Sequence, residues 1–179
     1  MRATGVVRRI DDLGRIVIPK EIRRTMRMRE GDPLEIFTEQ NGEIVLKKYS
    51  MMARISSYGQ SYADGLAKVS GLAVRVCDTD RVIAYCGRGK RDAINMPLTR
   101  EAEEIITART SYFKRFPGEK NICICRGSPL YVVGLTPVIT AGDCVGAIAL
   151  LSEAGQVLSD CAKKLLILSA TLLAGSAEG

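Results

Sequence analysis

The sequence predicts a mixed fold of two parts: a small N-terminal unit of short strands with one helix, and a larger α+β unit with an antiparallel sheet flanked by helices. The length of 179 residues suits two small domains. Turn signals and charged residues are dense before residue 50, whereas Gly, Ala and Cys become more frequent after it. The later segments follow the order helix, two strands, helix, several strands, helix, which is typical of an α+β fold. We therefore expect a domain at 1–50, a linker at 51–55 and a domain at 56–179.

The N-terminal unit combines β-branched segments with clear turn signals. Asp11-Asp12-Leu13-Gly14 predicts a turn between two strands, and Asn41-Gly42 predicts a hairpin turn. Pro19 suits the first position of a helix, which Gly31 is expected to end. The expected elements are strands at 4–10 and 15–18, a helix at 19–28, and strands at 34–38 and 43–48. A unit of about 50 residues buries too little surface to be safely stable alone, so we expect an obligatory dimer through this segment.

The second unit shows longer segments with helical or strand patterns. Thr99 is a suitable N-cap, and acidic residues follow it in the first turn. The last helix is apolar nearly all round from Leu165, so it should be buried. Either it packs on its own sheet, or it pairs with the first helix of this unit between protomers and holds a tetramer together. The expected helices are 55–69, 99–109 and 156–174, and the expected strands are 72–77, 82–86, 112–116, 121–126, 130–137 and 144–152.

Positive charge is concentrated at the start of the chain. The net charge of the whole chain is +6, and residues 1–29 hold nine Lys and Arg against three acidic residues. Residues 30–46 hold five acidic residues and no basic one. Guanidinium groups can fork onto phosphates and onto guanine edges. The N-terminal arginines therefore favour a DNA-binding surface over a merely solvated charged face.

Other residue types limit the chemistry that the chain can perform. The sequence has no His, which removes Ser-His-Asp and Cys-His catalysis together with the commonest metal ligand. Its six Cys all follow residue 70, and Cys123-Ile124-Cys125 is interpreted as buried small apolar residues on one strand face. Asp78 and Asp80 are interpreted as turn residues. We expect no enzyme activity, no cofactor and no metal site.

Neither a secretory leader nor a membrane span is expected. No apolar run follows Arg2, and the most apolar stretch, 165–174, is about half of the ~20 residues that a helical span requires. These features predict a cytoplasmic protein with reduced cysteines and without a membrane partner.

Residues 4–25 read TGVVRRIDDLGRIVIPKEIRRT, residues 31–36 read GDPLEI and residues 44–49 read IVLKKY. Through these segments the first 50 residues closely resemble the AbrB-type DNA-binding domain of bacterial transition-state regulators. It implies a swapped-hairpin β-barrel dimer that binds double-stranded DNA. The DNA-contacting arginines of the family match Arg8, Arg15, Arg23 and Arg24, and Arg9 is a weaker candidate at a position that is basic in the family.

The resemblance also implies how such a regulator works. Members of the family recognise many operators without a tight consensus, which fits phosphate contacts and readout of DNA shape. The implied setting is the control of late genes in a spore-forming bacterium, inside the developing spore.

The second unit has a distinctive strand order, flanking helices, and the segments GLTPVI at 134–139 and GAIAL at 146–150. In these features it resembles, more distantly, a GAF-type sensor domain. This resemblance implies an unidentified small-molecule partner without naming ligand-binding residues. The loop at 87–91, GRGKR, is either a solvated hairpin tip or an anion site, and it lacks the P-loop pattern. Two alternative functions remain: an antitoxin-like protein, and a sensor or scaffold that does not bind DNA.

Overall fold

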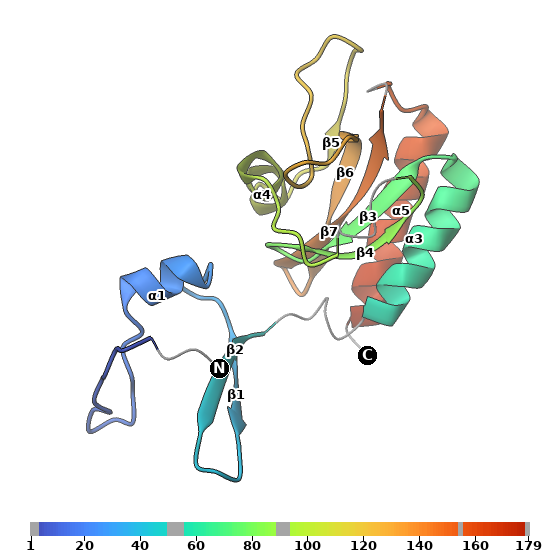
Figure 1. Cartoon of the computed structure of the whole chain (residues 1–179). Helices are drawn as coiled ribbons and strands as arrows, with labels where there is room; N and C mark the ends of the chain where they lie inside the picture. The colour runs from blue at the N-terminus through green and yellow to red at the C-terminus, as the bar shows by residue number, and fades with distance from the viewer. Residues whose placement is uncertain (1–3, 50–55, 89–93, 154–155, 178–179) are drawn as a thin grey trace. The chain divides into compact units, whose positions relative to one another are not determined.

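The computed structural model describes residues 4–49, 56–88, 94–153 and 156–177. The chain divides into two compact units, Met1–Tyr49 and Ser50–Gly179 (Figure 1). They are called the N-terminal and the C-terminal unit below. The expected linker at 51–55 lies outside the described residues, as do residues 89–91 of the GRGKR loop.

The N-terminal unit holds one helix and one hairpin within its described residues. The helix α1 spans Lys20–Thr25, and the antiparallel strands β1 (Leu34–Thr38) and β2 (Ile44–Lys48) pair in register along their whole length. Gly42 has a φ of 83° and donates its N–H to Glu39 O at 3.0 Å, so the turn forms where Asn41-Gly42 predicts it. The predicted hairpin is confirmed.

The two strands expected at 4–10 and 15–18 are not formed within one chain, and this prediction is wrong for the single chain. The turn between them does form, because Gly14 N donates to Asp11 O at 3.0 Å and Asp11 N donates to Arg15 O at 3.1 Å. A strand needs a neighbour whose backbone completes its hydrogen bonds. These two segments find none among the described residues of their own chain.

The helix α1 ends earlier than its sequence predicts. Its last residue is Thr25 rather than Met28, and Gly31 belongs to the following turn. Arg27 has a φ of 52°, and Met28 N donates to Arg23 O at 2.7 Å. This 6→1 bond closes the helix in the manner of a Schellman motif, with an arginine in the left-handed position that glycine usually occupies.

The C-terminal unit is a five-stranded antiparallel sheet between helices (Figure 1). The strand order is β4-β3-β7-β6-β5, and every neighbouring pair is antiparallel. The helices are α3 (Ser56–Ser70), α4 (Arg100–Thr107) and α5 (Asp160–Ala177). The strands are β3 (Ala73–Cys77), β4 (Val82–Cys86), β5 (Tyr112–Phe113), β6 (Tyr131–Thr140) and β7 (Asp143–Ser152).

Each face of this sheet carries its own apolar layer. On one face α3 and α5 lie side by side, and Leu66, Leu166 and Leu173 pack with the buried residues of the sheet (Figure 1). On the other face α4 and the loops around Ile124 cover a second buried layer. The α+β architecture expected from the order of elements is therefore confirmed.

Three element boundaries differ from the prediction. The expected strand at 121–126 is not a strand, because Cys123 and Cys125 each make one isolated bridge, to Tyr131 and Leu98. Its apolar pattern reflects burial, since Ile124 and Cys125 lie in the core. The expected strand at 112–116 is reduced to β5, and the last helix begins at Asp160 rather than at residue 156.

The last helix is only half buried, which corrects the expectation that its apolar sequence would be covered on all sides. Leu166, Ala170 and Leu173 face the core. Leu168 and Leu172 remain 53% and 51% exposed. Packing on its own sheet therefore accounts for one side of α5, and the opposite side is an apolar surface.

Candidate nucleic-acid interface

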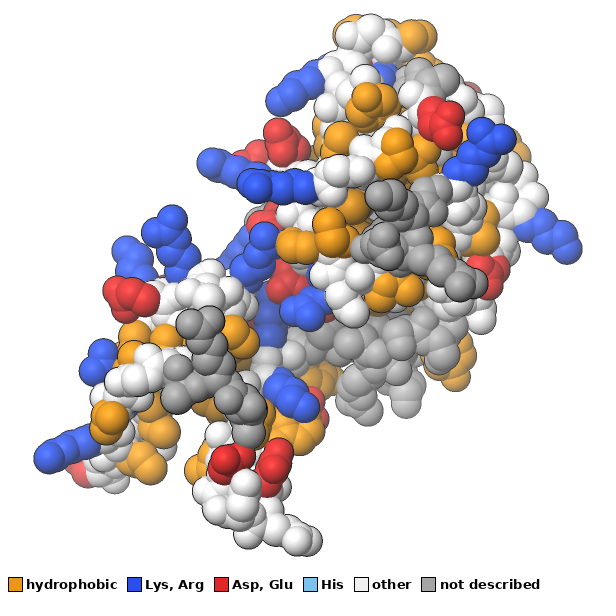
Figure 2. Space-filling model, in the orientation of Figure 1, with side chains coloured by type: hydrophobic (Ala, Val, Ile, Leu, Met, Phe, Trp, Pro, Cys, Tyr) orange, Lys and Arg blue, Asp and Glu red, His pale blue; other side chains and the backbone are white. Residues whose placement is uncertain are grey.

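The five candidate arginines lie in three places of the N-terminal unit. Arg8 and Arg9 are exposed residues that precede the first turn. Arg15 follows that turn, and Arg23 and Arg24 lie in the last turn of α1. Lys and Arg side chains stand out from this unit next to apolar ones (Figure 2).

Arg15 is the arginine whose position the structure explains most fully. Asp11 Oδ1 accepts hydrogen bonds from Leu13 N at 3.0 Å and from Arg15 N at 2.8 Å. Its other oxygen, Oδ2, accepts from Arg15 Nε at 2.8 Å, while the Arg15 side chain stays 69% exposed. One carboxylate thus forms the turn and orients the guanidinium, whose remaining N–H groups are available to a phosphate.

The hydrogen bonds from Arg15 also lower the pKa of Asp11. The Arg15 backbone N–H has the largest effect and its side chain the next largest, and both stabilise the carboxylate form. The turn is therefore arranged at neutral pH with Asp11 ionised. The sequence pattern predicts Asp11 as a turn residue but does not predict its contact with Arg15.

Arg23 and Arg24 differ in exposure although they are neighbours. Arg24 is exposed, whereas Arg23 is half-buried and its Nε has no hydrogen-bond partner in the described structure. A buried guanidinium N–H without an acceptor is unfavourable. Arg23 therefore lies where an additional acceptor, from a second chain or from a ligand, would complete its hydrogen bonding.

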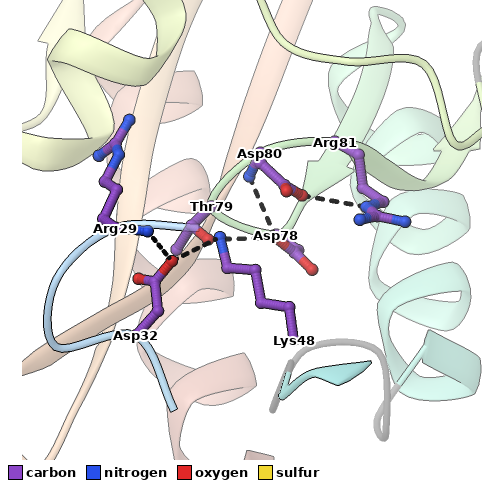
Figure 3. Close-up of polar contacts among 7 residues, drawn as sticks. All are labelled: Arg29, Asp32, Lys48, Asp78, Thr79, Asp80 and Arg81. Carbon is purple, nitrogen blue, oxygen red and sulfur yellow. Dashed lines mark hydrogen bonds and ion pairs between the residues drawn. The ribbon is translucent and has the colours of Figure 1, made fainter. Parts of the chain in front are cut away.

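A second carboxylate, Asp32, holds the segment after α1 to the hairpin. It accepts a hydrogen bond from Arg29 N at 2.8 Å, and its Oδ2 lies 3.4 Å from Lys48 Nζ (Figure 3). These contacts connect the segment after α1 to β2.

The N-terminal unit has no interior of its own. None of residues 4–49 is buried, and large apolar side chains are open to solvent, including Val7 at 85%, Ile10 at 62% and Val17 at 74%. A soluble domain does not normally leave most of its aliphatic residues exposed. The unit therefore presents its arginines on a chain whose large apolar side chains are not buried.

In the C-terminal unit, the acidic and cysteine residues noted in the sequence have structural roles. Asp78 Oδ1 accepts from Asp80 N at 3.1 Å, and Asp80 pairs with Arg81 at 3.0 Å, so the two acids stabilise the β3–β4 turn as expected (Figure 3). Cys77 and Cys125 are buried, and burial raises the pKa of the Cys77 thiol well above its usual range. Within the residues that the structure describes, no group of three or more acidic or Cys side chains could hold a metal ion.

The C-terminal unit has a buried charged residue that the sequence pattern does not single out as functional. Arg75 lies in the centre of β3 and is 2% exposed, although its strand reads as an apolar segment. The feature of the sequence that could have indicated this buried arginine is a single charged residue between two valines, Val74 and Val76. Long charged side chains are almost never fully buried unless they have a partner.

Each of the two units matches a known protein family. Residues 54–178 match the family described as stage V sporulation protein T C-terminal, transcription factor. Residues 7–53 match the family described as antidote-toxin recognition MazE, bacterial antitoxin. Stage V sporulation protein T of Bacillus subtilis is 41% identical over 182 residues, which cover 99% of each chain. This chain belongs to the stage V sporulation protein T family. The family is one of transcription factors, in agreement with the expectation that the chain is not an enzyme.

Other relatives cover one unit each. The transition state regulatory protein AbrB of Bacillus subtilis is 42% identical over 74 residues, which are 41% of this chain and 76% of that protein. The N-terminal unit of this member of the stage V sporulation protein T family is therefore of the AbrB type, as the sequence resemblance implied.

Solved structures show the fold of the C-terminal unit. The GAF domain of an Acinetobacter phosphoenolpyruvate-protein phosphotransferase superposes with a TM-score of 0.55 at 11% identity, covering 74% of this chain and 84% of that one. A free methionine-R-sulfoxide reductase of Thermoplasma acidophilum reaches 0.54 at 14% identity, over 72% and 96% of the two chains. At such low identity these likenesses establish the GAF-like fold alone. None of the helices among the described residues is long and apolar enough to cross a membrane.

Proposed function

We propose that this protein is a transcription regulator that binds double-stranded DNA with relaxed sequence specificity through paired arginine clusters. Two copies of the domain at 1–50 form the DNA-binding dimer, and the domain at 56–179 supports a higher assembly and receives a small-molecule signal. The observation that carries the proposal is a unit without a buried core, in which positive charge is concentrated at residues 1–29. The proposed setting is the cytoplasm of a developing spore, where the protein controls late genes.

Dimerisation follows from the missing core of the N-terminal unit. Burying one large aliphatic side chain contributes about 1.5–3 kcal/mol, and several such side chains are open in the single chain. The segments at 4–10 and 15–18 also have backbone groups that need strand partners. A second copy that exchanges these segments would supply both the ladder and the apolar cover, as in a swapped-hairpin barrel.

DNA binding follows from the kind of charge that the dimer would present. Arg8, Arg15, Arg23 and Arg24, with Arg9 as the weaker candidate, would appear twice, and two copies match the near-symmetry of a duplex site. Long exposed arginines suit phosphate contacts and readout of groove width more than a fixed base code. Relaxed specificity is therefore the expected behaviour of this surface.

The test replaces Arg15 or Arg23 by Ala and measures the affinity of the full chain for several duplexes of unrelated sequence. Each dimer loses two contacts, so we expect affinity to fall about tenfold or more for all duplexes alike. Arg100→Ala is the matched control, because it removes one exposed arginine from α4, where Arg100 pairs with Glu104 at 2.8 Å. A loss confined to one duplex would contradict shape readout and point to a base-specific contact.

The exposed side of α5 supports a further assembly of dimers into a tetramer. Leu168 and Leu172 lie one helical turn apart and are half exposed, so a second α5 can pack against them. Replacing both by Gln leaves the core residue Leu166 in place and should reduce the mass of the full chain in light scattering from a tetramer to a dimer. An unchanged mass would exclude this interface.

An antitoxin-like function is the second candidate. The description of the family that matches residues 7–53 favours it. Antitoxins with this type of domain usually pair it with a disordered toxin-binding tail, whereas residues 56–177 here form a packed sheet and helices. Co-purification of a toxin with the full chain would support this candidate. The remaining alternative, a sensor without DNA binding, predicts no shift of any duplex at low salt.

A further inference from the structure

The C-terminal unit contains a buried cation without a described carboxylate partner. Arg75 is 2% exposed on the α4-facing side of the sheet, in register with Tyr85 on β4 and Ala149 on β7. No ion pair joins it to an acidic residue in the described part of the chain. A guanidinium that is removed from water needs strong compensating contacts.

The hydrogen bonds of Arg75 use only part of its capacity. Its Nη1 donates to Val74 O at 2.9 Å and to Cys86 O at 3.4 Å, and its Nη2 donates to Arg88 O at 3.3 Å. A guanidinium has five N–H groups in a fixed planar fork. Nε–H and one N–H of Nη2 therefore remain without an acceptor among the described residues. All three acceptors that are present are neutral carbonyls, and two of these bonds are long.

One edge of the guanidinium carries Nε–H and one N–H of Nη2. That edge presents two parallel donors, which is the geometry that a carboxylate accepts with both of its oxygens. The Tyr85 ring lies 5.2 Å from Arg75 Cζ and contacts the cation through its π face. The protein thus holds the guanidinium with carbonyls and an aromatic ring, while two of its N–H groups have no acceptor among the described residues.

The surroundings of Arg75 are small and apolar. On the same face its neighbours along β3 are Ala73 and Cys77, and its neighbour on β7 is Ala149. Burial lowers the pKa of Arg75, and the nearby thiols of Cys125 and Cys77 act in the opposite direction. None of these groups carries a negative charge at neutral pH, so a bound anion would meet no like charge from them.

We infer that Arg75 binds the carboxylate of a small, mainly apolar acid on the α4-facing side of the C-terminal sheet. This inference rests on the proposed role of this unit as the receiver of a small-molecule signal, and it gives that signal a chemical class. A single planar fork favours a carboxylate, whereas a phosphate ester would require further basic groups around it.

The test uses the full chain and straight- or branched-chain monocarboxylates of three to six carbons, each compared with its primary amide as a neutral control. We expect at least one acid to raise the melting temperature in a saturable manner, by about 5 °C, and its amide to have no such effect. Arg75→Gln should abolish the shift. Arg75→Lys, which keeps the charge without the fork, should retain only a small part of it.

A measurement on the unmodified protein guards against variants that fail to fold. The NMR signal of Arg75 Nε–H should move and its exchange with water should slow when the acid is added. The inference is overturned if no acid changes the melting temperature or this signal, if the amides act as strongly as the acids, or if folded Arg75→Gln retains the shift. If the same sample still binds duplex DNA, only the ligand inference fails, whereas loss of DNA binding by the unmodified chain would refute the proposed function itself.

Discussion

At the scale of the residue, a single carboxylate prepares the candidate DNA surface. Asp11 accepts hydrogen bonds from two backbone N–H groups of the first turn and from the Arg15 side chain. Its ionised form is required for the contact with Arg15. The geometry of that turn, and the presentation of Arg15, should therefore depend on the protonation of Asp11.

The first prediction concerns the titration of Asp11. Its pKa is lowered in the folded unit, so it should titrate by carboxyl NMR below its ordinary value of 3.8. A lowered pKa means that the stabilisation of the turn is complete above the unfolded-state value and is lost as the pH falls through the folded-state value. In Arg15→Ala the midpoint should move back toward 3.8. A midpoint at or above 3.8 in the unmodified chain would contradict the contact.

The candidate residues that could be predicted from the sequence are those whose chemistry is visible in their type, whereas residues whose role depends on the fold could not be predicted. Clustered arginines indicate an anionic partner wherever they lie, and a family resemblance assigns five of them. The role of Asp11 depends on the turn that brings Arg15 back to it. The role of Arg75 depends on which face of β3 it occupies and on what the neighbouring strands place beside it.

At the scale of the element, α4 forms where its sequence predicts it, with Thr99 as the N-cap. Thr99 accepts from Ala102 N at 3.2 Å as the N-cap, and its hydroxyl donates to Cys123 O at 2.6 Å. One side chain thus starts the helix and also anchors the loop that crosses this face of the sheet.

The second prediction follows from these two bonds. Thr99→Ala should lower the free energy of unfolding of the C-terminal unit by about 1–2 kcal/mol, because the cap is lost and a carbonyl is left without its donor. Thr99→Ser retains the hydroxyl and serves as the control. Denaturant unfolding of the full chain, followed by far-ultraviolet circular dichroism, measures the difference. Equal losses in both variants would show that the methyl group matters rather than the hydrogen bonds.

The turn between β6 and β7 is less well matched to its sequence. Ala141 and Gly142 connect Thr140 to Asp143 with φ values of 50° and 84°. Two successive positive φ values define a type I′ turn, which favours Asn-Gly. Alanine in this conformation costs about 1–2 kcal/mol because its Cβ approaches the following carbonyl oxygen.

The third prediction is that Ala141→Asn stabilises the C-terminal unit by about 1 kcal/mol, since Asn tolerates the left-handed conformation better than Ala. Ala141→Val, in which the branched side chain tolerates this conformation less well than Ala, should destabilise it. Thermal unfolding of the full chain checks both changes. An Asn variant no more stable than the unmodified chain would contradict the role of backbone strain here.

The pattern of residues predicts elements well where one chain supplies all the contacts. The β1–β2 hairpin, the β3–β4 pair and α4 lie close to their expected ranges. The strands expected at 4–10 and 15–18 have β-branched residues but no strand neighbour among the described residues of their own chain, and in the proposed dimer a second copy would supply that neighbour. The segment at 121–126 was wrongly predicted as a strand, because its apolar residues are buried in the core without regular strand pairing.

At the scale of the whole molecule, the N-terminal unit should be stable only as a dimer. Ile16 alternates with Arg15 along its segment, so in a strand it would point to the opposite side, toward the missing core. The fourth prediction is that Ile16→Asp places a charge in this core, lowers the mass of the full chain in light scattering and abolishes DNA binding. Gln40→Asp is the control, since it adds the same charge at the β1–β2 turn. It should leave the mass unchanged and alter the affinity for DNA by no more than a few-fold. An unchanged mass for Ile16→Asp would contradict the dimer.

The salt dependence of DNA binding tests the central claim most directly. The full chain is titrated into a labelled duplex at several salt concentrations, and the logarithm of the affinity is plotted against that of the salt concentration. A dimer that contacts phosphates through its arginines should give a steep line, and Arg15→Ala should reduce the slope by about two, one for each copy in the dimer. A chain that fails to bind the duplex even at low salt, or whose slope is the same with and without Arg15, would contradict the account.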